Sequence, residues 1–350
     1  FGVAWLGTTI SDLLVQSQRG WAVAILVYCA LASLLPVWLL LQPRGYLGGF
    51  VLYSALALGL FGMLFGGYEI AQPAFKGWDN GQAGGALFPF LFVTIACGAC
   101  SGFHGLVCSG TTSKQVARES HTRFVGYGAM LAEAFVAVIA LVTVLICTDA
   151  DLAGLKPGTI YGNGIGEFLT LLIGPERRAF AITFGAMAFS TFVFDTLDVA
   201  TRLGRYIVQE LLGWKGAVGA VTGTLATILP PLGFLLFADE GAYFRFWTLF
   251  GASNQLLAAL TLTAVAVWLH EEGRPKLFVL LPMAFVATIT LWALADIVWT
   301  NASAAQGLDV AGANAIAAGV LLLLALYLLA TGVSRLRRPA PAAVGGRSNG

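Results

Sequence analysis

Residues 94–112, TIACGACSGFHGLVCSGTT, place polar side chains and glycines inside a hydrophobic stretch. Steps of three and four residues separate the polar positions, so an unbroken helix would carry them on one face: Thr94, Cys97, Ser101, His104 and Cys108. The stretch ends in SGTT, a sequence that favours turns and helix caps. Such a segment is stable at membrane depth where protein or a water-filled cavity covers it. The pattern predicts a broken helix that lines a solute site, and the alternative is a tight seam of small residues between two helices.

A break in this segment would free backbone N–H groups at the start of the second half-helix. Free N–H groups and the positive end of the helix dipole both favour a carboxylate. A later apolar run contains GASNQ over residues 251–255, whose amide side chains can bind either a solute or another helix. We predict that the substrate contacts these residues: Ser101, Gly102, His104, Ser109, Gly110, Thr111, Thr112 and Asn254.

The same polar residues do not form a recognisable catalytic or metal site. His104 is the only histidine clearly inside an apolar span, whereas a membrane haem normally needs two buried axial ligands. Ser101 and His104 lie one turn apart, but nothing supplies the third group and the oxyanion hole of a hydrolase. Cys97 and Cys100 form one CxxC pair without a second pair or two histidines beside it. We therefore expect no enzymatic activity, no cofactor and no bound metal.

Two carboxyl groups lie in spans where ionised side chains are costly. An ionisable group at the bilayer centre costs at least ~2.5 kcal/mol unless it is paired or hydrated. Glu133 lies nine residues into the apolar run 124–147, and Asp195 lies near the end of the run 178–200 without an obvious compensating charge. Burial favours the neutral form of a carboxyl group, so both are candidates to carry a coupling proton. The alternative for Glu133 is a structural hydrogen bond to a neighbouring helix.

The residues around Asp195 suggest two further features. Asp198 and Arg202 are four residues apart in a helix and should form a structural ion pair at the membrane interface. Ser190 and Thr191 carry hydroxyl oxygens that suit a small hard cation such as sodium. The commoner alternative is that each hydroxyl simply donates to the preceding helical turn.

The composition indicates a membrane protein. Of the 350 residues, 58% are hydrophobic and 11% are charged, and the mean hydropathy is +0.83. Soluble domains rarely have this composition, whereas proteins with many transmembrane helices do. The net charge of +1 and the absence of a basic stripe give no reason to expect nucleic acid as a partner.

Nine apolar runs are long enough to cross a bilayer. They lie near residues 21–42, 48–68, 86–108, 124–147, 178–200, 215–238, 244–270, 276–298 and 313–334. One alternate set of loops and ends then carries 13 of the 19 Lys and Arg residues, and the other carries 6. By the positive-inside rule this asymmetry predicts a cytoplasmic carboxyl terminus. The longest loop, 148–177, should face outward, and its YGNGIGEF sequence could form a short helix or a re-entrant turn.

These spans predict an all-α membrane bundle with one transporter domain over residues 1–334. Residues 335–350 are rich in Arg, Pro, Ala and Gly and should form a disordered cytoplasmic tail. The chain begins with Phe and shows no signal peptide, so we expect it to be a piece of a longer protein.

Several long blocks resemble the carbon starvation protein A family. They are LPVWLLLQPRGYL, TIACGACSGFHGLVCSGTTSKQ, GYGAMLAEAFVAVIAL, FSTFVFDTLDVATRLGRYIVQEL and LFGASNQLLAALTL, in this order along the chain. The resemblance implies an inner-membrane protein with the LeuT-type fold of the amino acid–polyamine–organocation transporters. It also implies a longer chain, in which residues 86–112 would form the first helix of a second inverted repeat. Family members are described as peptide transporters induced by carbon starvation, and relatives as proton-coupled pyruvate uptake systems.

From the residues and the resemblance we expect a secondary transporter for pyruvate or short peptides. Its coupling ion would be a proton, with sodium as the alternative, and its other partner would be the lipid bilayer. A membrane sensor for a carboxylate or peptide nutrient is the second hypothesis, and a purely structural subunit is the third.

Overall fold

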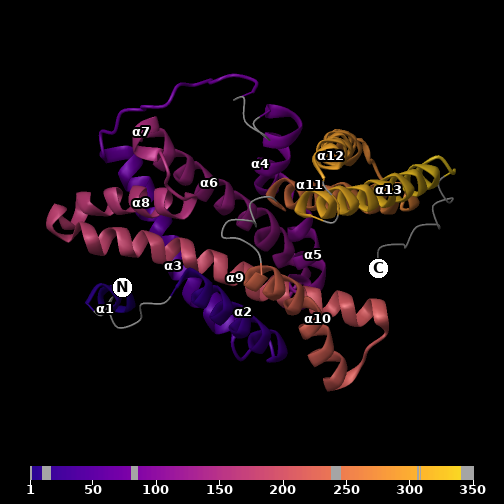
Figure 1. Ribbon diagram of the computed structural model, residues 1–350, viewed down its shortest axis with the longest axis horizontal. Coiled ribbons are helices and arrows are strands. Elements are labelled where there is room, and N and C mark those ends of the chain that lie inside the picture. The colour runs from indigo at the N-terminus through magenta and orange to yellow at the C-terminus, as the bar shows by residue number, and fades with distance from the viewer. Residues whose placement is uncertain are drawn as a thin grey trace, which may run out of the picture. The chain divides into compact units, whose positions relative to one another are not determined.

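The computed structural model describes residues 2–9, 17–79, 86–237, 246–305, 307 and 309–339. Their regular structure is helical, apart from an isolated β-bridge between Asp79 and Ala86. The chain divides into two compact units, each discontinuous in sequence (Figure 1). The first unit comprises Phe1–Phe75 and Ala117–Ala238, and the second comprises Lys76–Val116 and Asp239–Gly350.

The first unit is built from eight of the described α-helices, together with short 3-10 and π-helical turns before α6 and α9. The α-helices are α1 (Gly2–Thr9), α2 (Gln18–Leu34), α3 (Leu41–Phe65), α6 (Ala129–Leu145), α7 (Asp149–Leu152), α8 (Pro157–Ile173), α9 (Arg178–Leu212) and α10 (Gly216–Phe237). Local chemistry explains several boundaries. The Ser17 side chain accepts a hydrogen bond from the amide of Gly20 and caps α2. Gly213, with φ 67°, ends α9 in the left-handed conformation that favours glycine.

The hairpin of α8 and α9 forms the core of the first unit. Gly158, Gly162 and Gly166 recur every four residues along α8 and face α9. A side chain added at Gly185 of α9 would meet the carbonyl oxygen of Gly162 at 2.5 Å, so the two backbones touch. Small residues at this spacing allow membrane helices to approach closely. The segment that we expected to be mostly loop, 148–177, is therefore largely a packed helix.

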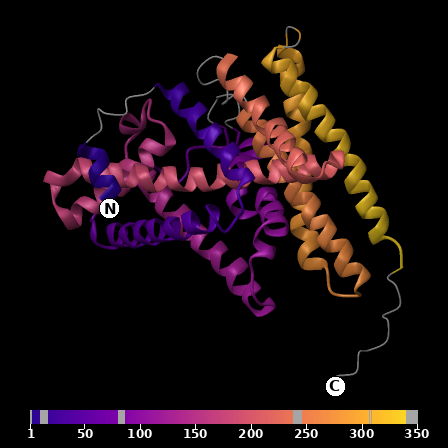
Figure 2. The ribbon, with the colours of Figure 1, turned by 90° about the horizontal axis from the view of Figure 1, so that it is seen from below.

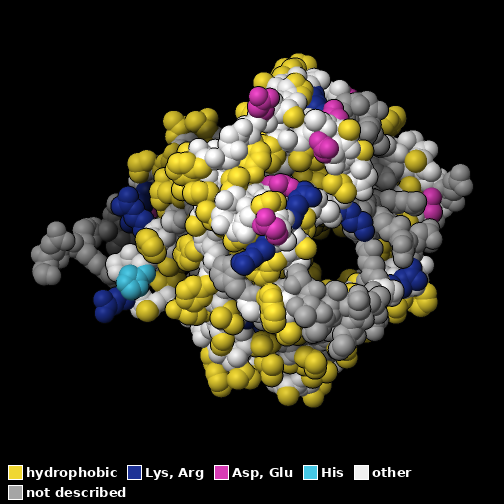
Figure 3. All heavy atoms as spheres, turned by 90° about the vertical axis from the view of Figure 1, so that its left-hand side faces the viewer, with side chains coloured by type: hydrophobic (Ala, Val, Ile, Leu, Met, Phe, Trp, Pro, Cys, Tyr) yellow, Lys and Arg dark blue, Asp and Glu magenta, His cyan; other side chains and the backbone are white. Residues whose placement is uncertain are grey.

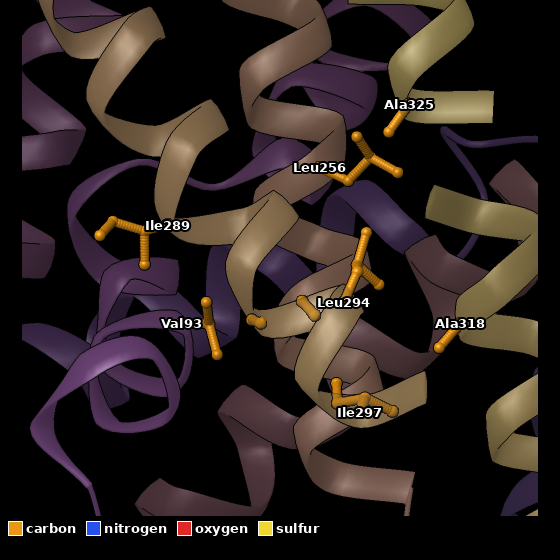
Figure 4. Close-up of a cluster of buried hydrophobic side chains, with 9 residues drawn as sticks. Val93, Leu256, Ile289, Leu294, Ile297, Ala318 and Ala325 are labelled. Carbon is orange, nitrogen blue, oxygen red and sulfur yellow. The ribbon is translucent and has the colours of Figure 1, made fainter. Parts of the chain in front are cut away.

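The second unit contains five α-helices among its described residues. After a short π-helical turn, these are α4 (Phe92–Ala99), α5 (Gly102–Gly110), α11 (Trp247–Glu271), α12 (Leu277–Ala304) and α13 (Val310–Leu336). The last three lie side by side (Figures 1 and 2). Their contact surfaces bury a cluster of aliphatic side chains that also takes in Val93 from α4 (Figure 4). This cluster is the hydrophobic core against which the broken segment packs.

Seven helical segments of the described chain are long and apolar enough to cross a bilayer, so the expected count of nine is not confirmed. They are Leu41–Phe65, Glu119–Leu145, Pro175–Leu212, Gly216–Phe237, Trp247–Glu271, Leu277–Ala304 and Val310–Leu336. The predicted span 21–42 is wrong in its extent, because Leu35 precedes Pro36 and adopts an extended conformation that ends α2. The predicted span 86–108 is interrupted after Ala99.

Much of the surface suits lipid rather than water. Hydrophobic side chains are spread over the face shown in Figure 3, whereas charged side chains form a few small groups. Long apolar side chains are exposed along α3 and α13, including Tyr53, Leu64, Leu323 and Tyr327. At the carboxyl end α13 continues to Leu336, and residues 340–350 of the predicted tail lie outside the described residues.

The contact between α8 and α9 generates a prediction about stability. Replacing Gly185 with Ala should destabilise the protein by about 1–3 kcal/mol, because the new methyl group would push the backbones apart. Gly49→Ala is the matched control, since nothing lies within 4 Å of a methyl group there and Ala favours helix by up to ~1 kcal/mol. Thermal unfolding of both variants in one detergent tests this. Equal unfolding temperatures would contradict close packing at Gly185.

Candidate functional site

The predicted break is present between α4 and α5. The first helix ends at Ala99 and the second begins at Gly102, with Ser101 in an extended conformation between them. The Ser101 hydroxyl oxygen accepts a hydrogen bond from the amide of His104 at 3.3 Å and so caps α5. The polar stripe expected on one continuous helix is therefore divided between two short helices.

Asn254 of α11 completes the cap of α5. Its Oδ1 atom accepts a hydrogen bond from the amide of Phe103 at 2.8 Å and lies 3.3 Å from the hydroxyl oxygen of Ser101. Gly102 makes this approach possible, because a side chain there would collide with Leu257 and with the α11 backbone. Two of the amides freed by the break are thus bound within the protein, which corrects the expectation that they would be bare.

The nitrogen of the Asn254 amide, Nδ2, differs from the oxygen in its hydrogen bonding. The Phe103 amide can only donate, so the Asn254 atom that faces it is the oxygen and the Nδ2 group points elsewhere. The side chain is buried, and Nδ2 has no hydrogen-bond partner among the described residues. The neighbouring Gln255 is also buried, and neither of its amide atoms has such a partner in the described part of the chain. Buried polar groups without partners are uncommon and point to a ligand or a further contact.

The remaining predicted substrate residues are spread along α5. His104 lies exposed in its first turn. Ser109, Gly110, Thr111 and Thr112 lie at its far end, where Gly110 is roughly 12 Å from Gly102 at 1.5 Å per residue. The Ser109 hydroxyl donates to the carbonyl of Leu106 at 3.1 Å, whereas Thr111 is buried and its hydroxyl has no partner among the described residues. The structure therefore brings Ser101, Gly102 and Asn254 together and places the SGTT residues apart from them.

A second polar cluster lies in the first unit, around Arg44 in the first turn of α3. The guanidinium donates to Asp195 Oδ1 at 2.9 Å and to the hydroxyl of Tyr28 at 2.8 Å, and lies 3.2 Å from Asp198 Oδ2. Asp198 is fully buried, whereas Asp195 is one-third exposed. A cavity of about 290 Å³ opens beside the cluster, and its lining includes Tyr28, Arg44 and Asp195. One cation thus compensates two carboxylates on α9.

This cluster changes two expectations about charge pairing. Asp195, for which we saw no obvious compensating charge, pairs with Arg44. Asp198 also pairs with Arg44, rather than with Arg202 as predicted. Arg202 instead donates to the carbonyl oxygens of Ala32 and Leu35 at 2.6 and 2.8 Å. These carbonyls lie at the carboxyl end of α2, where backbone acceptors have few helical partners. The Ala32 carbonyl accepts the amide of Leu35 at 3.3 Å, and the buried guanidinium adds a second bond to it.

Arg44 and Tyr28 were not among the predicted site residues. Arg44 is the only charged residue between Arg19 and Glu69, and this isolation in an apolar region was a usable signal. Tyr28 carried no comparable signal, since aromatic residues are common in apolar helices.

The other predicted residues of the first unit have ordinary local contacts. The hydroxyls of Ser190 and Thr191 donate to the carbonyls of Ala186 and Met187 at 2.8 and 2.9 Å, which is the structural alternative that we considered. Glu133 lies on an exposed face of α6, although we expected it to be buried.

The Arg44 cluster predicts a large effect on stability. Replacing Arg44 with Ala leaves Asp198 buried without its cation and should lower the free energy of unfolding by about 3–5 kcal/mol. Arg178→Ala is the control, because it removes an exposed ion pair with Glu167 and should cost less than ~1 kcal/mol. Denaturant titration in one detergent measures both. Adding Asp198→Asn to Arg44→Ala should recover part of the loss, and equal stability of the two single variants would argue against a buried pair.

Comparison with known proteins places the chain in one family. A family model described as carbon starvation protein CstA matches residues 3–163 and 155–293. The peptide transporter CstA of Mycobacterium tuberculosis is 33% identical over 320 residues, which cover 72% of this chain and 42% of that protein. The pyruvate/proton symporter BtsT of Escherichia coli is 31% identical over 355 residues, which cover 77% of this chain and 50% of that protein. No solved structure matches the chain at a significant level.

A third relative, the peptide transporter CstA of Campylobacter jejuni, is 33% identical over 77% of this chain and 48% of its own length. The chain thus spans about half the length of the curated relatives that it matches. The apolar helices and these relatives together identify a multi-pass membrane protein. The match to the family model covers most of the sequence, and the chain therefore belongs to the carbon starvation protein CstA family.

Proposed function

We propose that the chain is the part of a secondary active transporter that binds a small carboxylate, either pyruvate or the carboxyl end of a short peptide. The observation that carries the proposal is the helix break at Ser101, with the buried Asn254 amide held across it. The names of the relatives support the solute class, since they include peptide transporters and a pyruvate/proton symporter. Pyruvate and peptides share a carboxylate, which is the group that this site suits.

The proposed contact is between the substrate carboxylate and the Nδ2 group of Asn254. Phe103 and Ser101 already occupy its Oδ1 atom and hold the amide in one orientation. Nδ2 is a buried donor without a partner among the described residues, and leaving such a donor unpaired costs about 1–3 kcal/mol. A carboxylate would satisfy it and would also lie near the positive end of α5. Ser101 and His104, in the first turn, would complete the contacts.

The proposed coupling ion is the proton, and the proposed carrier is Asp195. When Asp195 is ionised, it binds Arg44 and helps to hold α3 against α9. Protonation would remove this attraction while Asp198 kept its contact with Arg44. The strength of the contact between α3 and α9 would therefore depend on whether Asp195 carries a proton. An alternating-access mechanism needs such a dependence from its coupling group. Glu133 is the second candidate.

The proposed location is the inner membrane, with the carboxyl terminus in the cytoplasm. Five basic residues support this orientation, because they lie at the carboxyl ends of α11 and α13 or directly after them, whereas residues 305–309 between α12 and α13 contain none: Arg274, Lys276, Arg335, Arg337 and Arg338. This orientation places the ends of α11 and α13 that carry Glu271 and Arg335 on the cytoplasmic side.

Asn254→Asp should abolish carboxylate uptake without unfolding the protein. The aspartate keeps an acceptor for the Phe103 amide, but it lacks the Nδ2 donor and would repel an anion. Uptake of labelled pyruvate and of a labelled dipeptide into proteoliposomes with the full protein measures the effect, and thermal unfolding checks the fold. We expect at least a tenfold loss of uptake of whichever solute the protein carries, as one lost charge-assisted contact implies. Wild-type uptake by a folded variant would exclude Asn254 from the site.

Asp195→Asn should separate uptake from the proton gradient. The asparagine cannot release a proton, so accumulation driven by an inward proton gradient should fall to the level of equilibrium exchange. Glu133→Gln is the matched variant, since it removes a carboxylate in the same way on another helix of the same unit. If Glu133→Gln loses gradient-driven uptake and Asp195→Asn keeps it, the assignment reverses. If both keep it, the coupling group lies elsewhere.

A further inference from the structure

We propose that the groove between α11 and α13 binds an anionic phospholipid. The groove has a volume of about 400 Å³ and belongs entirely to the second unit. The two helices run in the same direction, because Glu271 and Arg335 at their carboxyl ends form an ion pair at 3.6 Å. The groove follows them from Leu260 to Glu271 on α11, a length of roughly 16 Å at 1.5 Å per residue.

The deep part of the groove suits an acyl chain. Its walls include Leu260, Ala264 and Val267 from α11 and Leu328 from α13. At its floor the helices touch, because a side chain on Gly332 would collide with Thr263. Thr263 also donates its hydroxyl to the carbonyl of Ala259 at 2.7 Å, so it presents its methyl group rather than a free donor. An apolar, elongated groove between two membrane-spanning helices matches a hydrocarbon chain better than a polar solute.

The mouth of the groove suits a phosphate. Arg335 and its ion-pair partner Glu271 line it. Further cations follow in the sequence, directly after α13 and in the loop before α12. In the described part of the chain, five cations at this end face two carboxylates: Arg274, Lys276, Arg335, Arg337 and Arg338 against Glu271 and Glu272. A cluster of this size next to a membrane helix attracts anionic lipids. The charge, together with the apolar groove below it, favours a phospholipid over a neutral lipid or a peptide.

The surrounding contacts hold the mouth in place. His270 bonds the carbonyl of Arg338 at 2.8 Å and also contacts Lys276, which keeps the end of α13 against α11 and α12. Trp268 lines the groove and is half-exposed, and the guanidinium of Arg274 lies 5.7 Å from its ring centre. Tryptophan is enriched where the hydrocarbon of a bilayer meets its headgroups. Trp268 therefore marks the depth at which glycerol and phosphate groups would lie.

Trp268 also supplies the measurement. The full protein is reconstituted into vesicles of phosphatidylcholine with increasing fractions of brominated phosphatidylglycerol, and bromine quenches tryptophan in contact with it. The Trp268 signal is the difference between the wild type and Trp268→Phe. We expect quenching at lower mole fractions than with brominated phosphatidylcholine. Arg335→Gln and Arg337→Gln should each reduce this preference about fivefold, whereas Lys215→Gln, which lies in the other unit, should leave it unchanged.

A second variant tests the groove itself. Ala264→Trp in the Trp268→Phe background fills the apolar part but leaves all the cations, and it should lower the binding of phosphatidylglycerol measured by native mass spectrometry. Equal quenching by the two brominated lipids would show contact with bulk lipid only and would overturn the proposal. Absence of quenching by either lipid would show that protein covers the groove, either from the rest of the chain or from a second copy, and would overturn it as well.

Discussion

A polar group that is withdrawn from water must find a partner inside the protein, and this constraint explains most of the described structure. At the helix break, Ser101 and Asn254 bind two amides that α4 and α5 cannot satisfy. At the end of α2, the guanidinium of Arg202 binds the carbonyls of Ala32 and Leu35. For Asn254 and Arg202 the partner is a side chain of a different helix, so an irregularity in one segment also fixes the position of another.

The same constraint organises the charges. Asp198 is fully buried on α9, and its carboxylate lies 3.2 Å from the guanidinium of Arg44, which comes from α3. Tyr28 of α2 then holds the far side of the guanidinium. Three helices of the first unit thus meet at one cation. Each of the two carboxylates therefore acts on a group that all three helices share.

The sequence predicted the membrane class and the location of the broken helix, because both depend on local composition and on glycine and serine in a short window. It did not predict that Asn254 would bind the freed amide of Phe103, since this contact joins residues about 150 positions apart and follows from packing. The ion pair of Asp198 with Arg44 was missed for a similar reason, because the expected partner was the nearest arginine on the same helix and Arg44 comes from another helix. The predicted span 21–42 was wrong in its extent at Pro36, where the restriction on the residue before a proline outweighed continuous hydropathy. The helical nature of α8 was left open because its glycines suggest turns, while their four-residue spacing serves helix packing.

Gly102 has a mechanical consequence. Because Gly102 has no side chain, the backbones of α5 and α11 are in contact there. The hydrogen bond from the Phe103 amide to Asn254 joins the first turn of α5 to α11 at the same place. Sliding one helix along the other would break this bond and drive Leu257 into α5, so the pair should travel as a rigid block. If the protein bends near α5 to admit a solute, the bend should then lie outside the α5–α11 contact. It would lie either at Cys100, before α5, or after Gly110, where α5 ends.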